Sequence, residues 1–176
     1  MARQRKHQVW KGALAGLAGG LVASWTMNQF QTALSRIIQS RRQKANSEQQ
    51  VTQSTDMDKP ATLMLAEKLS QAVLHRDIRP DQQKRAESLV HYVYGTGWGG
   101  LYGALSAVKP VTTAGVGLPF GAALWLWGDE IAVPVLGLAK GPQHYPLATH
   151  FHALASDFVY AVTTEAVRRA MLKALD

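Results

Sequence analysis

Four long apolar stretches, separated by polar connections, dominate the pattern of this chain. They cover residues 12–34, 88–108, 112–138 and 147–171. Their central parts hold no Lys or Arg, and each stretch as a helix is long enough to cross the hydrocarbon core of a bilayer, which is about 30 Å thick. The pattern therefore predicts an all-α, polytopic membrane helix bundle of about four transmembrane helices, forming a single domain over residues 1–176.

The polar connection at 35–87 contains one segment with helical periodicity. It follows Pro60, a residue suited to the first turn of a helix. Apolar side chains recur on one face, with Glu67 on the other; the apolar positions are Ala61, Leu65, Leu69, Ala72 and Val73. We expect an amphipathic helix that lies on the membrane surface or caps the bundle, preceded over 35–59 by a linker rich in Gln, Ser and Arg.

Two alternatives to this membrane topology stay open. A basic start followed by a short apolar run is also typical of a signal peptide, but no cleavage site of small residues follows, which favours a retained first span. The mean hydropathy is only −0.10, a low value for a membrane protein. A soluble helical protein is therefore the second alternative.

The net charge of +7 is concentrated outside the apolar stretches. Lys and Arg gather before residue 12, between residues 35 and 88, and from Arg168 onward, where they would meet anionic headgroups. We expect a lipid bilayer as the partner of these cations and predict no binding of nucleic acid. The absence of Cys excludes disulfides, iron–sulfur clusters and zinc sites built from thiolates.

Glycine recurs at four-residue spacing in three of the apolar stretches. Small residues on one helix face allow close helix packing in lipid, where packing replaces the hydrophobic effect. We expect helix–helix contacts, within the chain, in a homo-oligomer or in a larger membrane complex, through Gly12, Gly16, Gly20, Gly95, Gly99, Gly103, Gly117 and Gly121.

An acidic pair interrupts the longest apolar stretch. Asp129 and Glu130 are adjacent, so their side chains would point about 100° apart on a regular helix and one would face lipid. Gly128 precedes them, and Pro134 lacks the amide hydrogen that would bond the carbonyl of Glu130. We therefore predict a broken helix there, with both carboxyl groups turned inward.

Further ionisable side chains lie in two of the other stretches. His150 and Asp157 are two turns apart on one face, whereas His152 is offset from that face. Together with the acidic pair and one more histidine they form a candidate proton or ion pathway: His91, Asp129, Glu130, His150 and Asp157. The alternatives are purely structural hydrogen bonds, or a metal or haem site; because no Glu-x-x-His spacing occurs, we predict no metal site.

The sequence contains few motifs that are typical of enzymes. The segment Y-G-T-G-W-G-G-L-Y-G is glycine-rich, but neither a strand nor a Lys-Ser/Thr accompanies it as in a phosphate loop. No Gly-x-Ser-x-Gly elbow occurs. We therefore predict no catalytic residues and no cofactor.

The chain contains, after His91 at the entrance of the second stretch, the segments A-G-V-G-L-P-F-G-A-A-L-W-L-W-G-D-E, P-V-L-G-L, F-H-A-L-A-S-D-F-V-Y and T-E-A-V-R-R. This order of features resembles the YagU-like family of bacterial inner-membrane proteins. The resemblance is best over residues 90–172. It implies a multi-pass protein of the bacterial inner membrane and supplies neither a reaction nor site residues.

Two functional hypotheses follow from the residues. One is a small protein that handles protons or ions through the polar side chains above. The other, from a different class, is a non-catalytic scaffold or accessory subunit that packs through its glycine-rich helix faces.

Overall fold

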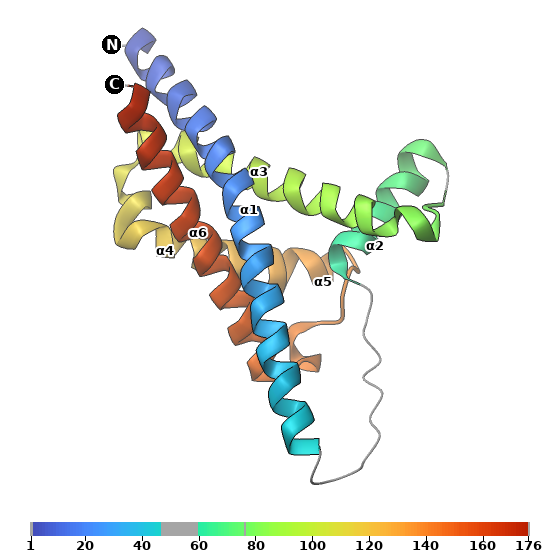
Figure 1. Cartoon of the computed structure of the whole chain (residues 1–176). Helices are drawn as coiled ribbons and strands as arrows, with labels where there is room; N and C mark the ends of the chain where they lie inside the picture. The colour runs from blue at the N-terminus through green and yellow to red at the C-terminus, as the bar shows by residue number, and fades with distance from the viewer. Residues whose placement is uncertain (1, 47–59, 76, 176) are drawn as a thin grey trace.

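The computed structural model describes residues 2–46, 60–75 and 77–175, and all of its regular structure is helical. The all-α class is therefore confirmed. Only one segment of the described chain, Val111–Val135 with a mean hydropathy of 1.2, is long and apolar enough by itself to count as a candidate membrane span. The α-helices labelled in Figure 1 are α1 (Ala2–Asn46), α2 (Ala61–Leu69), α3 (Gln83–Val108), α4 (Leu118–Leu124), α5 (Val133–Val135) and α6 (Leu147–Leu175).

Helix α1 continues well beyond the predicted end of the first span. No Gly or Pro occurs between Gly20 and Pro60 to end it. Hydroxyl groups along it donate to the carbonyl four residues earlier, as from Ser35 to Gln31 at 2.8 Å. The polar connection consequently begins after Asn46 rather than at residue 35, and the remainder of the predicted linker, 47–59, lies outside the described residues.

The amphipathic helix after Pro60 is present as α2, but the buried face is not the predicted one. Leu63 and Ala66 are buried, whereas Leu69 and Val73 are exposed. The reason is that α2 packs against α3 and stops early: a π-helical turn over Ser70–Leu74 ends at His75, whose φ of 53° is left-handed. Helix α3 then follows a turn at Pro80–Gln82 and ends before Lys109 and Pro110, as the sequence predicts.

The third apolar stretch is interrupted, but at a different point from the predicted one. Its first part, Pro110–Gly117 (η3), turns through Gly115 and Gly117, both with positive φ. From Leu118 the chain is helical through Glu130 and Pro134 to Val135, with wider π-helical bonding over Trp125–Ala132 (η4). The predicted break at the acidic pair is therefore wrong, because the helix continues through the pair with π-helical instead of α-helical hydrogen bonds.

The close contact between α1 and α3 is made by six of the glycines. In Figure 1 α3 crosses α1, and α6 runs antiparallel to α1, so that both termini lie at one end of the molecule. A Cβ atom added at Gly20 would lie 2.6 Å from the carbonyl oxygen of Gly95, and one at Gly12 would lie 2.5 Å from that of Gly103. Between these two contacts, Gly16 faces Gly99. The backbones therefore touch along the crossing, a geometry that only glycine permits.

The remaining two glycines of the predicted set, Gly117 and Gly121, lie outside the contact between α1 and α3. Gly121 lies against α6, since an added Cβ atom would be 2.8 Å from the carbonyl oxygen of Asp157. Gly117 precedes α4 with a φ of 85°, a left-handed backbone conformation that residues other than glycine rarely adopt. One of the two glycines thus allows close packing, and the other allows a turn.

Many large apolar side chains lie on the outside of this bundle, while its interior combines Ala, Leu and Tyr side chains with several polar ones. Leu101, Trp127 and Phe151 are 46%, 57% and 67% exposed. The buried polar residues are Ser24, Ser106, Ser156, Asp157, Thr164, Glu165 and Arg168.

Candidate functional site

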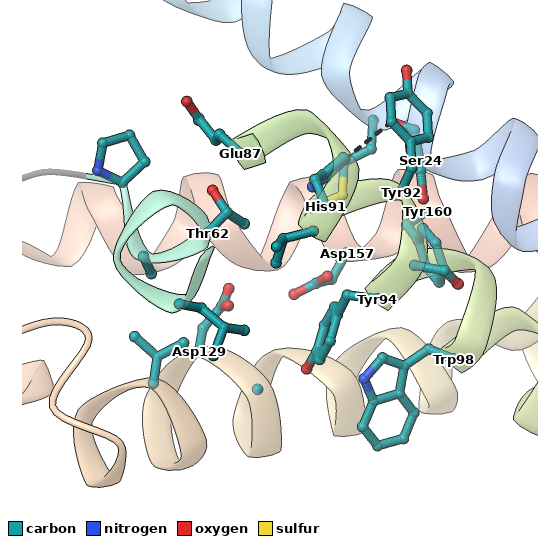
Figure 2. Close-up of a pocket in the computed structure, with 18 of the residues that line it drawn as sticks. Ser24, Thr62, Glu87, His91, Tyr92, Tyr94, Trp98, Asp129, Asp157 and Tyr160 are labelled. Carbon is teal, nitrogen blue, oxygen red and sulfur yellow. Dashed lines mark hydrogen bonds between the residues drawn. The ribbon is translucent and has the colours of Figure 1, made fainter. Parts of the chain in front are cut away.

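A cavity of about 420 Å³ lies where α1, α2, α3, η4 and α6 meet (Figure 2). Acidic residues from three elements line it, namely Glu87, Asp129 and Asp157. His91 is also part of the lining, and none of the described lining residues is Lys or Arg. In a chain with a net charge of +7, this hollow is therefore a place where acidic side chains gather and Lys and Arg are absent from the described lining.

Asp157 is the most deeply placed of these acids. It lies on α6 and is only 5% exposed, and its Oδ2 atom is buried with no hydrogen-bond partner in the described structure. One turn further on, the hydroxyl of Tyr160 donates to the carbonyl oxygen of Gly95 at 2.5 Å, which fixes α6 against α3. A buried polar atom without a partner is costly, so this carboxyl group is suited to bind something that enters the cavity.

Asp129 connects the main cavity to a smaller one. It comes from η4, is exposed within the hollow, and in Figure 2 its carboxyl group is turned towards the space that Asp157 also faces. Its neighbour Gly128 makes room for the hydroxyl of Tyr94, which an added Cβ atom would approach to 3.1 Å. Asp129 also lines a second hollow of about 120 Å³, which holds Glu130 and His150.

Glu130 and His150 form a close pair in that second hollow. The Nδ1 atom of His150 lies 2.5 Å from Oε1 of Glu130, and its Nε2 atom lies 3.1 Å from the carbonyl oxygen of Pro142. Because a backbone carbonyl only accepts, Nε2 carries a hydrogen. The short contact at Nδ1 then requires one more proton, shared between the imidazole and the carboxyl group. The geometry of the pair is therefore that of a shared proton between His150 and Glu130.

The structure divides the predicted polar residues into two groups. His91, Asp129 and Asp157 share the main cavity, with Nε2 of His91 3.3 Å from the carbonyl oxygen of Ser24. Glu130 and His150 form the pair next to it. His152 faces away and is exposed, as its offset on the helix predicts. No group of three or more metal-ligating side chains comes together among the described residues.

Aromatic residues, which the sequence analysis did not single out, complete the wall of the main cavity. The rings of Tyr94 and Trp98 meet edge to face with their centroids 6.0 Å apart, and Trp98 lies next to Phe120 at 6.4 Å. Tyr94, Trp98 and Tyr160 all line the hollow. Their spacing on helices is that of ordinary core residues, so the sequence holds no signal that would separate them from packing side chains.

A second buried polar cluster, also unpredicted, joins α3 to the far end of α6. Glu165 is 0% exposed and accepts hydrogen bonds from Arg168 Nε at 2.7 Å and from the hydroxyl of Tyr102 at 2.9 Å. Its other oxygen accepts from Arg168 Nη2 at 2.9 Å and from Arg169 Nε at 2.5 Å. The spacing of E-A-V-R-R signals the ion pairs, but nothing in the sequence points to Tyr102. Since all these groups are paired, the cluster is structural.

The chain matches no protein-family model, no curated protein and no solved structure. The resemblance to the YagU-like family therefore stays a prediction, and the function has to be argued from the site.

Proposed function

We propose that the chain is a multi-pass membrane protein of the bacterial inner membrane. Large side chains such as Leu101 and Trp127 turn outward, where lipid would cover them, and the polar groups turn inward. Both termini lie at one end of the molecule, with Lys11 Nζ 3.4 Å from the carbonyl oxygen of Leu175, which fits an even number of crossings. The four spans are the apolar parts of α1, α3, the segment from η3 to α5, and α6.

We further propose that this protein handles protons or small ions. The observation that carries the proposal is the position of Asp129, which lines both the main cavity and the hollow of the Glu130–His150 pair. A proton released by that pair has Asp129 as its next acceptor, and Asp157 faces the same space further inside. Ionisable side chains at membrane depth that face an inner cavity are the usual parts of such pathways.

Substitution of Asp129 tests this proposal. In liposomes that contain the full-length protein, a pH-sensitive dye and a potassium ionophore for charge balance, we expect an imposed pH gradient to collapse faster than in empty liposomes. Asp129→Asn keeps the size of the side chain but removes its titration, so the rate should fall to that of empty liposomes. Asp77→Asn is the matched control, because Asp77 is exposed and bonded only locally to Gln71 at 2.9 Å.

The scaffold hypothesis makes the opposite prediction for this measurement. If liposomes with the unchanged protein leak no faster than empty ones, the pathway is refuted. A specific observation supports the scaffold as second candidate: Leu69 at the end of α2, Val73 in the π-helical turn and Leu89 in the first turns of α3 are each exposed. Such side chains suit contact with a partner helix or a second copy, and their replacement by Ser would then change the oligomeric state.

A further inference from the structure

The main cavity combines acidic groups, a partnerless carboxyl oxygen and aromatic walls. We propose that it binds a small organic cation, a primary ammonium group on a short alkyl chain, with Asp157 as its main anionic partner and Asp129 as the second. The inference names a ligand class for the site on which the proposed function rests, but the binding does not depend on transport.

The charge of the wall determines the sign of the ligand. Glu87, Asp129 and Asp157 are matched by no Lys or Arg among the described lining residues, and His91 is the one basic side chain there. Several charged groups near the cavity are engaged with other partners. Glu130 is engaged with His150, and the cations of the α6 terminus, Arg168 and Arg169, bind Glu165. A cation in the cavity would supply the missing countercharge.

The free oxygen of Asp157 determines what kind of donor is needed. Its Oδ2 atom is buried and has no hydrogen-bond partner in the described structure, and the residue as a whole is only 5% exposed. An ammonium group brings three N–H donors, so it can satisfy Oδ2 and still bond Asp129. A neutral alcohol brings only one donor and no charge.

The rest of the wall favours an organic cation over a bare metal ion. Tyr94 and Trp98 line the cavity, and aromatic rings attract cations; Met27 and Leu124 are apolar neighbours for an alkyl chain. A metal ion would need several oxygen or nitrogen ligands around one point, and no group of three such side chains exists in the described part of the chain. The volume of about 420 Å³ also exceeds what a single ion fills.

Helix α2 covers one side of this site. Ala61 and Leu65 contribute to the wall, and Lys68 Nζ donates to the carbonyl oxygen of Leu136 at 2.6 Å, which fastens α2 to the end of α5. That lysine is not among the lining residues, so its charge is used at the helix end and not inside the cavity.

Calorimetric titration of the purified full-length protein in detergent tests the proposal. The probe is n-butylammonium chloride, with butan-1-ol as its neutral analogue and sodium chloride as the inorganic cation. We expect saturable binding of butylammonium only. Asp157→Asn should weaken it by at least about tenfold, the loss expected for one charge-assisted hydrogen bond. Asp77→Asn, the same change outside the cavity, should leave it unaltered.

Several results would overturn the inference. Equal binding by the Asp157→Asn variant would place the ligand elsewhere, equal binding of butan-1-ol would make the cavity merely apolar, and equal binding of sodium would make it an inorganic ion site. Near-ultraviolet circular dichroism of the Asp157→Asn variant must match the parent, so that lost binding is not lost folding; if it does not, Asp129→Asn is titrated in its place. Butylammonium binding without a proton leak in liposomes would refute the proposed function alone.

Discussion

Two glycines on the same helix, two residues apart, are expected to respond in opposite directions to the same substitution. Gly99→Ala should destabilise the protein by about 1–3 kcal/mol, because the added Cβ atom would lie 2.5 Å from Cα of Gly20 on α1. Gly97→Ala should stabilise it by about 0.5–1 kcal/mol, because a Cβ atom there meets nothing within 4 Å and alanine is the better helix former.

The measurement is the free energy of unfolding of both variants in the same detergent, followed by circular dichroism. Both substitutions add one methyl group to α3, so Gly97→Ala controls for composition and helix propensity. Equal and favourable effects at the two positions would show that α1 and α3 are not in backbone contact, and the crossing in Figure 1 would then be wrong.

Loss of the buried carboxylate of Glu165, in the C-terminal half of α6, should cause the largest loss of stability. Glu165→Ala removes the acceptor of Arg168 and Tyr102 and leaves a buried guanidinium unpaired, which should cost about 3–5 kcal/mol. Asp77→Ala, at an exposed acid, should change the stability by less than about 0.5 kcal/mol.

A paired substitution separates the ion pair from simple loss of packing. In Glu165→Gln with Arg168→Gln both charges are absent, so the double variant should be more stable than Glu165→Gln alone. If the double variant is instead the less stable of the two, each side chain contributes independently and the buried pair has no special role.

The sequence predicted the helical class and the ends of several helices, because local signals set them. Pro60, Pro80 and Pro110 each mark a helix boundary that the structure contains. The interruption of the third stretch was misplaced because two signals competed. Pro134 and an acidic pair suggested a break, but π-helical bonding keeps Trp125–Ala132 helical. The actual turn uses the positive φ of Gly115, Val116 and Gly117, three residues within an apolar run that gives no signal of a turn.

Chemical type alone identified the acids and histidines of the site, but not their grouping. Sequence spacing places His150 and Asp157 on one face of α6, yet they belong to different hollows, because Glu130 engages the imidazole first. The aromatic wall depends on contacts between helices far apart in the chain, as when Trp98 meets Phe120. Such contacts follow from how the helices cross, which periodicity does not encode.

The central proposal is that the apolar outside of the bundle faces lipid, while the acidic cavity, as part of a proton or ion pathway, is reached from the aqueous phase. Because the chain has no Cys, single cysteines can carry spin labels without background. In protein reconstituted into bilayers, a label at Leu101→Cys, on the outer face of α3, should collide with oxygen and not with a water-soluble nickel chelate. A label at Asp129→Cys, in the cavity, should collide mainly with the chelate. Equal access of the chelate to both labels would contradict a membrane-embedded bundle.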